Sequence, residues 1–412
     1  MVAELLYNES MKKNGCLLST PLTIGLTIPW LWFLWGAVTW QSWAIGAWGL
    51  ALIWLPLSWA RRNSKPNRSG TSGDSPPNQT DASAKPTVRL RPFLPLLVLF
   101  LGLSCVLIWQ TPSRRTSIDS PISNQYAPRD GETHQPSWFS LPNIVPEKEQ
   151  INLGFRLMPW VDPVLTSDQA KTVSKVTMQL YDELESDPEF RSLGSVLGSG
   201  YCDISLRPYD DGHYFLYVSD ALDRDQPKPA IVFLHGSGGN FKPYIWLWSK
   251  LAKQEGYVII APTFGFGHWN REAGLKAVAA ALEDAKSKTN IDTDSIYLAG
   301  LSNGGLGVSQ VAANDATTYK GVIFLSPVID GPRLNTKEYV DGWRGRPQLV
   351  ITGKEDRRIP IQYVDSYVAF CEESEIDVTY KSFSAQDHFL FFYKAEEVFA
   401  DINAWLKQCQ SK

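Results

Sequence analysis

The most constraining feature of the sequence is the segment 296–307, where a short apolar run leads into Gly-Leu-Ser-Asn-Gly and then into a helical pattern. Residues 296–299 are of strand type, and Gly300 and Gly304 remove side chains from a sharp turn. The pattern G-x-S-x-G places the hydroxyl of Ser302 at a strand-to-helix turn. Such a hydroxyl is a weak nucleophile by itself, so it needs a histidine base and hydrogen-bond donors from elsewhere in the chain.

Apolar runs and helical patterns alternate through the second half of the chain. Residues 230–234 form a continuous apolar run, which is typical of a strand buried on both faces. The alternation implies right-handed crossovers and a doubly wound, mostly parallel sheet of the α/β class. An opening pair of strands is expected at 201–206 and 214–218. Further strands are predicted at 257–260, 295–299, 321–325, 348–352 and 378–383, and helices at 244–254, 271–288, 303–314, 363–374 and 393–408.

Four motifs between about residues 200 and 409 resemble those of the α/β-hydrolase superfamily. They are Leu-His-Gly-Ser-Gly-Gly at 234–239, Gly-Leu-Ser-Asn-Gly at 300–304, Gly-Lys-Glu-Asp-Arg-Arg-Ile-Pro at 353–360, and Asp387-His388. Their order along the chain matches serine, acid and histidine. The region is most similar to the compact esterase branch, which includes dienelactone-hydrolase-like and polyhydroxybutyrate-depolymerase-like esterases. The first 200 residues have no counterpart in that family core.

The resemblance implies an α/β-hydrolase fold and a catalytic triad of Ser302, Asp356 and His388. Ser302 would attack an acyl carbonyl, and His388 would take its proton and return it to the leaving group. Asp356, just after the strand 348–352, would orient the imidazole. Glu355, its neighbour in the sequence, is the alternative acid.

The family pattern also implies an oxyanion hole and gives other roles to the remaining histidines of this region. The backbone N–H of Asn303 and one N–H from the Ser237/Gly238 turn would stabilise the oxyanion. His235 is expected to hold the loop after its strand. His268, in a glycine-rich loop, either lines the substrate cleft or is exposed.

The first 110 residues have the pattern of a membrane region. Residues 16–60 contain no Asp, Glu, Lys or Arg, and eight of the sixteen Trp lie there. One crossing needs only about 20 apolar residues, so two crossings fit in this stretch. The loop 61–91 carries seven Lys or Arg, which the positive-inside bias places in the cytoplasm. Three crossings would then leave the catalytic domain outside the cytoplasm, in a multi-pass membrane protein. The expected helices span about residues 21–39, 43–60 and 92–109.

Other interpretations of this region are open. A cleaved signal peptide fits poorly, because the apolar stretch is long and follows a polar N-terminus. Residues 92–109 could instead form a buried core helix, and a single crossing within 16–60 would leave the basic loop outside. Residues 1–91 carry nine Lys or Arg against four Asp or Glu, which leaves −9 for the rest of a chain with a net charge of −4. The second part is therefore not basic enough to suggest a nucleic-acid partner.

Between the membrane region and the catalytic domain, a linker and a helical extension are expected. Residues 111–150 are rich in Pro and Ser, which is typical of a linker. Residues 151–195 form an N-terminal extension containing a helix at 166–186, which packs on the catalytic domain or on a partner. The catalytic domain itself is placed at 196–412.

The spacing of the motifs predicts a domain without a cap. Only the 22 residues 326–347 separate the strand after the elbow helix from the acid strand, too few for a folded cap. An open cleft would suit small esters, polymer ends or acyl groups on larger molecules. Trp246, Trp248 and Trp269 are candidates for an acyl pocket, although Trp246 and Trp248 at helical spacing are also typical of a core.

The cysteines indicate neither a metal site nor a disulfide framework. Five cysteines are scattered without CxxC spacing, and no cofactor or metal is implied. Cys202, Cys371 and Cys409 fall on the expected extracytoplasmic side. The resemblance places Cys371 and Cys409 near the last two helices, on opposite faces of the sheet, so no bridge between them is expected.

These features favour a membrane-anchored serine esterase acting on small-molecule or polymer esters, with its oligomeric state open. A serine peptidase related to prolyl oligopeptidase shares the triad order but usually carries a propeller, which has no counterpart here. A non-catalytic α/β-hydrolase-fold binding protein is the third hypothesis.

Overall fold

The computed structural model describes residues 121–127, 146–191, 193–204, 212–219 and 226–411, together with scattered helical positions between 27 and 54. The chain divides into two compact units, 1–110 and 111–412. The three expected membrane helices lie mostly or wholly outside the described residues. Within the described residues, no helix combines the length and the apolar character that a membrane span requires. The account below concerns the second unit.

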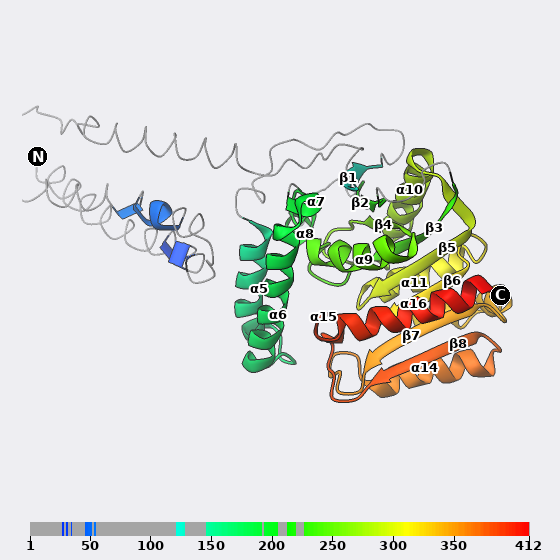
Figure 1. Ribbon diagram of the computed structural model, residues 1–412. Helices are drawn as coiled ribbons and strands as arrows, with labels where there is room; N and C mark the ends of the chain where they lie inside the picture. The colour runs from blue at the N-terminus through cyan, green and yellow to red at the C-terminus, as the bar shows by residue number, and fades with distance from the viewer. Residues whose placement is uncertain are drawn as a thin grey trace, which may run out of the picture. The chain divides into compact units, whose positions relative to one another are not determined.

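The centre of this unit is a sheet of eight described strands in the order β1-β2-β4-β3-β5-β6-β7-β8 (Figure 1). The pairs β1–β2 and β2–β4 are antiparallel, and the remaining neighbours run parallel. The predicted doubly wound, mostly parallel sheet is thus confirmed. The strands are β1 (Ile122–Tyr126), β2 (His213–Tyr217), β3 (Lys228–Leu234), β4 (Val258–Pro262), β5 (Ile291–Leu301), β6 (Gly321–Leu325), β7 (Pro347–Gly353) and β8 (Asp377–Phe383).

Helices cover both faces of the sheet, because the central strands are apolar on both sides. On β3, Ile231 and Phe233 enter one core, while Val232 and Leu234 enter the other. The first core is closed by α9 (Lys242–Glu255), α15 (Leu390–Tyr393) and α16 (Ala395–Ser411). The second is closed by α10 (Glu272–Lys288), α11 (Gly304–Asn314), α12 (Gly331–Leu334), α13 (Lys337–Trp343) and α14 (Ile361–Glu373).

The two described cysteine side chains lie in different cores. Cys371 of α14 and Cys409 of α16 are both buried, and neither forms a disulfide bond within the described residues. Cys371 belongs to the second core and Cys409 to the first, so the sheet separates them. This is the placement on opposite faces that the family resemblance implies.

An antiparallel helical hairpin precedes the catalytic motifs (Figure 1). It consists of α5 (Glu147–Val161) and α6 (Ser167–Ser186), followed by the short helices α7 (Pro188–Arg191) and α8 (Gly198–Ile204). The start of α6 is fixed by a capping box, in which Thr166 accepts from the N–H of Gln169 and the Gln169 side chain accepts from the N–H of Thr166. The predicted helix at 166–186 is confirmed, but the extension begins at Glu147 rather than at 151.

The predicted linker and the predicted first strand both differ from the structure. The range 111–150 was expected to be a linker, yet it contains β1, the antiparallel edge strand paired with β2. The opening pair of strands is therefore β1 and β2, because most of the strand expected at 201–206 lies in α8. The carboxylate of Asp203 explains α8: it accepts hydrogen bonds from the Phe266 N–H and the Arg271 guanidinium, and these tertiary contacts override local strand propensity.

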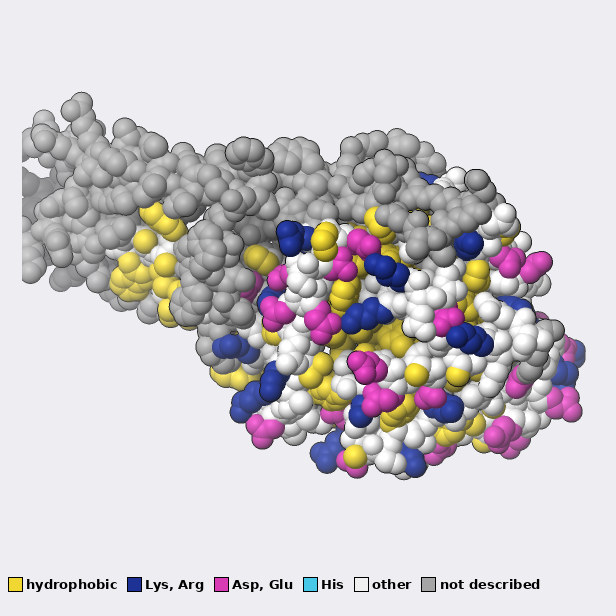
Figure 2. Space-filling view, in the orientation of Figure 1, with side chains coloured by type: hydrophobic (Ala, Val, Ile, Leu, Met, Phe, Trp, Pro, Cys, Tyr) yellow, Lys and Arg dark blue, Asp and Glu magenta, His cyan; other side chains and the backbone are white. Residues whose placement is uncertain are grey.

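Charged side chains of both signs are interspersed over the part of the surface that Figure 2 shows. The visible described face therefore carries no broad single-sign field of the kind that gathers nucleic acid.

Candidate active site

Ser302 stands at the turn between β5 and α11. Its φ of 53° is in the left-handed region, which is costly for a residue with a side chain. The turn is held by the Ser302 N–H, which donates to the Leu325 carbonyl, and by its own carbonyl, which accepts from the Val328 N–H, both at 2.9 Å. A Cβ on Gly304 would approach the Leu234 carbonyl oxygen to 2.1 Å. Glycine is therefore required at that position for the elbow to form.

The structure brings Ser302, His388 and Asp356 together from three different loops. The His388 Nε2 lies 2.9 Å from the Ser302 Oγ, and the His388 Nδ1 lies 2.7 Å from the Asp356 Oδ2. Because a carboxylate can only accept, Nδ1 carries the proton and Nε2 presents its lone pair to the serine hydroxyl. This is the arrangement in which an imidazole can act as a general base toward a serine.

The surroundings of Asp356 distinguish it from Glu355. The Asp356 side chain is fully buried, and its Oδ1 accepts from the Arg358 and Ile359 N–H groups at 2.8 and 2.9 Å. Both oxygens of this carboxylate are therefore held in place. Glu355 is exposed and has no hydrogen bond to His388. Of the two acids left open by the sequence, only Asp356 contacts the imidazole.

Of the N–H groups predicted to form the oxyanion hole, one already donates a hydrogen bond within the part of the protein that the structure describes, and two do not. Gly238 donates its N–H to the Phe266 carbonyl at 3.0 Å, so it is already used in holding two loops together. Ser237 and Asn303 both line the cavity that contains Ser302. Among the described residues, neither of these two N–H groups has a hydrogen-bond acceptor. Ser237 rather than Gly238 is therefore the candidate donor on this turn, together with Asn303.

His235 is a structural residue, as the sequence suggested. Its Nε2 accepts from the Phe264 N–H at 3.1 Å, and its Nδ1 lies 2.7 Å from the Gly236 carbonyl, which it reaches as a donor. The Trp269 indole donates to the His235 carbonyl at 2.8 Å. Complete burial lowers the pKa of His235 from its ordinary 6.5 to about 4, so the ring is neutral at pH 7.

This depressed pKa predicts a loss of stability in acid. Between pH 6.5 and about 4 the unfolded state binds a proton that the folded state refuses, so the free energy of unfolding falls as the pH falls through this window. Over the whole window, the free energy of unfolding should fall by about 3 kcal/mol. Urea unfolding of wild type and His235→Gln at pH 7 and pH 4.5 measures it. The wild type should lose more stability than the variant, and an equal loss in both would contradict the prediction.

His268 lies outside the cavity and pairs with Asp203. Its side chain is 44% exposed, and its Nδ1 is 2.9 Å from the Asp203 Oδ2. Burial tends to raise the pKa of Asp203, but hydrogen bonds from Phe266, His268 and Arg271 outweigh it and hold that pKa below its usual range. Of the two expectations for His268, surface exposure fits. In the described part of the chain, no three His, Cys, Asp or Glu side chains gather as metal ligands.

The serine opens into an apolar cavity of about 590 Å³, and α5 lines one side of it. Segment 326–347 forms only short helices, as the spacing predicts for a domain without a cap. The sequence did not indicate that the N-terminal extension would supply a wall of the cavity. The cavity residues of α5 repeat at helical spacing and so share one face. They are Gln150, Ile151, Gly154, Phe155, Met158 and Val161, with Asp162 just after the helix.

Both ends of the α5–α6 hairpin are fixed to the catalytic domain. At the start of α5, the Glu147 carboxylate is buried and accepts from the Tyr181 hydroxyl at 2.7 Å and from the Lys242 N–H at 2.8 Å. At its end, Asp162 forms an ion pair with Arg358, two residues after Asp356.

On α6, Gln169 donates to the Asp387 carboxylate at 3.0 Å. Asp387 directly precedes His388 in the chain, so the hairpin contacts the loops that carry the acid and the base. The sequence contained the apolar spacing of α5, but nothing in it indicated which surface this face covers.

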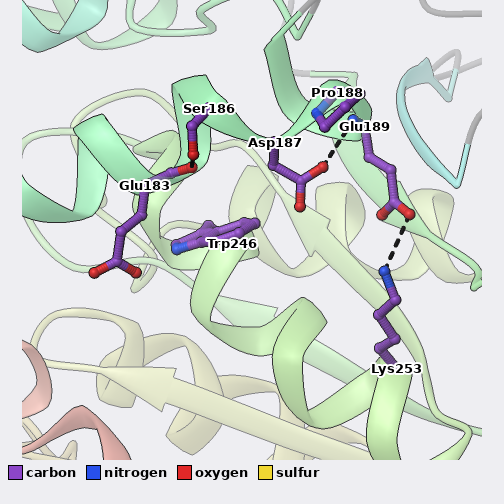
Figure 3. A pocket seen from close by; sticks show the side chains of 7 residues that line it. All are labelled: Glu183, Ser186, Asp187, Pro188, Glu189, Trp246 and Lys253. Carbon is purple, nitrogen blue, oxygen red and sulfur yellow. Dashed lines mark hydrogen bonds and ion pairs between the residues drawn. The ribbon is translucent and has the colours of Figure 1, made fainter.

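The tryptophans expected near the acyl group lie elsewhere. Trp248 is buried in the first core, and Trp269 packs edge-on against His235. Trp246 lines a separate hollow between α6, α7 and α9 (Figure 3). That hollow is otherwise lined by Pro188 and by charged and polar side chains, including the Glu189–Lys253 ion pair. The aromatic residues that line the cavity at Ser302 are instead phenylalanines, Tyr201 and Tyr244.

A family model and a curated relative each match part of this chain. Residues 225–382 match a hydrolase family model described as serine aminopeptidase, S33. A bifunctional acetylxylan esterase/xylanase of Neocallimastix patriciarum is 32% identical over 95 residues, which are 21% of this chain and 14% of that protein.

Among solved structures, Est1E from Butyrivibrio proteoclasticus is 18% identical, with a TM-score of 0.40 over 48% of this chain and 95% of that chain. A fluorophosphonate-binding serine hydrolase of Staphylococcus aureus, FphF, is 13% identical, with a TM-score of 0.40 over 47% of this chain and 92% of that chain. The motif order and the strand topology give the C-terminal unit an α/β-hydrolase fold, and the matched family model of serine hydrolases covers residues 225–382 of this unit.

Proposed function

We propose that the chain is a membrane-anchored serine hydrolase that cleaves carboxylic esters through an acyl-enzyme on Ser302. The observation that carries the proposal is the hydrogen-bonded series Ser302–His388–Asp356, with its serine at the floor of an apolar cavity. A serine, a correctly oriented imidazole and a buried carboxylate in this order are the requirements of nucleophilic acyl transfer.

In the first step the Ser302 Oγ bonds to the acyl carbon while its proton passes to the His388 Nε2. The negative charge that develops on the carbonyl oxygen is stabilised by the N–H groups of Ser237 and Asn303, each worth roughly 3 kcal/mol. His388 then gives the proton to the departing alcohol as the ester C–O bond breaks. In the second step a water molecule attacks the acyl carbon while His388 accepts its proton. The bond between the acyl carbon and the Ser302 Oγ then breaks as His388 returns the proton to Oγ, and the carboxylic acid is released.

The charges in the cavity favour esters over peptides. The family-model description names aminopeptidases, which must hold a free α-ammonium group. The acidic side chain lining the described cavity is Asp162, and it is already paired with Arg358. A peptide amino terminus would therefore find no unpaired carboxylate there. The partial match to an acetylxylan esterase supports the ester class, and the substrate is proposed as a small-molecule or polymer ester.

Matched substrates test this proposal. Purified protein should hydrolyse p-nitrophenyl butyrate with a kcat/KM at least about 100-fold above that for the corresponding butyryl and alanyl anilides. A preference for the alanyl anilide would instead support the peptidase. Failure to cleave either class, together with no reaction toward a fluorophosphonate probe, would support a non-catalytic binding protein.

The membrane anchor and the extracytoplasmic location of the domain remain proposals. They are supported by the uncharged stretch 16–60 and by the basic loop 61–91. An alkaline phosphatase reporter fused after residue 412 should be active, because alkaline phosphatase becomes active only outside the cytoplasm. Fluorescence of a green fluorescent protein fused at the same position would place residue 412 in the cytoplasm and would reject the three-crossing topology.

A further inference from the structure

The cavity above Ser302 has two apolar walls of different origin. One wall is the face of α5 with Phe155 and Met158. The opposite wall is aromatic, with the rings of Phe241 and Tyr244 stacked at 5.2 Å and those of Tyr244 and Phe392 stacked at 5.7 Å. The volume of about 590 Å³ is in the range of small-molecule pockets and is more than an acetyl group fills.

Gly154 lies in the middle of the α5 wall. An ideal Cβ built on it meets no heavy atom within 4 Å, so neither packing nor backbone geometry requires glycine here. Glycine within a helix is less favourable than alanine by roughly 0.5–1 kcal/mol. Gly154 lines the cavity, so the open space next to it adjoins the cavity.

The wall that contains Gly154 is fixed in place. Glu147 holds the start of α5, and its second carboxylate oxygen accepts from the Ser195 hydroxyl at 2.5 Å. The ion pair of Asp162 with Arg358 holds the other end. This ion pair pairs both charged side chains at this end of the cavity, which favours an uncharged group in the mostly apolar cavity.

We propose that Gly154 determines substrate specificity: by leaving the α5 wall without a side chain at its centre, it lets the cavity accept an extended, uncharged apolar group of the ester. This inference rests on the proposed esterase function. The group belongs to either the acyl or the alcohol part of the ester, and separate substrate series distinguish the two.

Filling the cavity from Gly154 tests the inference. In Gly154→Phe, the ratio of kcat/KM for p-nitrophenyl decanoate to that for the acetate should fall at least about tenfold. Gly154→Ala should shift it less, and Gly154→Leu replaces the phenylalanine variant if that one fails to fold. The matched control is Gly331→Phe, because Gly331 also has no heavy atom within 4 Å of its ideal Cβ and does not line the cavity. This control should leave the ratio unchanged.

The alcohol series compares the kcat/KM for 1-naphthyl acetate with that for ethyl acetate. A tenfold fall of this ratio in Gly154→Phe, without a fall in the p-nitrophenyl ratio, assigns the cavity to the alcohol group. A fall of the p-nitrophenyl ratio alone assigns it to the acyl group. Unchanged ratios in both series for a folded Gly154→Phe protein would overturn the inference.

A binding readout separates this inference from the esterase proposal. In a Ser302→Ala background, the neutral dye N-phenyl-1-naphthylamine should bind, and Gly154→Phe should weaken that binding at least about tenfold. If no ester is hydrolysed but the dye responds to Gly154, the esterase proposal fails and the apolar cavity stands. If the dye binds equally well with either residue, the role of Gly154 is refuted.

Discussion

Replacing Ser302 with alanine is expected to lower kcat for p-nitrophenyl esters by about 10⁶-fold. The alanine removes the oxygen that lies 2.9 Å from the His388 Nε2, and no acyl-enzyme can form without it. Covalent labelling by a fluorophosphonate probe should disappear in the same variant. Intact-protein mass spectrometry measures this as one added phosphonyl group on the wild type and none on the variant.

The matched control for this variant is Ser366→Ala. Ser366 is an exposed serine on α14 whose hydroxyl donates to the Gln362 carbonyl, away from the cavity. It should keep wild-type labelling and turnover. Undiminished labelling of a folded Ser302→Ala protein would place the nucleophile elsewhere, and both the triad and the proposed function would then be wrong.

The parts of the fold that the sequence predicted well are those set by local patterns. The strand at 321–325 and the elbow around Ser302 follow from continuous apolar runs and from glycines at fixed offsets. The order of motifs was enough to select His388 and to place an acid after β7. The sequence pattern did not distinguish Glu355 from Asp356. Asp356 is buried and Glu355 is exposed, and this difference in burial is visible only in the folded structure.

The parts that could not be predicted depend on contacts between distant segments. The edge strand β1 buries Ser123, Asn124 and Gln125, so its sequence looks like a polar linker until its partner β2 is in place. The N–H of Gly238 donates a hydrogen bond to the carbonyl of Phe266, a contact between two loops that no local sequence pattern encodes.

The α5 wall of the cavity is a further example. The motif spacing concerns only the segment between the elbow helix and the acid strand, whereas α5 comes from a segment far upstream of the serine. An amphipathic helix reports that it has an apolar face but not what that face will cover.

Replacing Asp356 with asparagine is expected to lower kcat by about 10⁴-fold while leaving the fold intact. The Oδ1 of Asp356 accepts from two backbone N–H groups, so the asparagine would keep its amide oxygen on that side. Its NH₂ group would then face the His388 Nδ1, which must become an acceptor. The imidazole proton would move to Nε2, where it blocks removal of the proton from Ser302.

The control is Glu355→Gln, which removes the same charge from the neighbouring, exposed carboxylate and should change kcat by less than about threefold. Kinetics of p-nitrophenyl butyrate hydrolysis and the melting temperature are measured for both variants. A large loss of kcat in Glu355→Gln with a small loss of kcat in Asp356→Asn would show that Glu355, not Asp356, is the acid that orients His388. Because the asparagine preserves volume and both backbone hydrogen bonds, a loss of activity without a loss of stability identifies the tautomer of His388 as the cause.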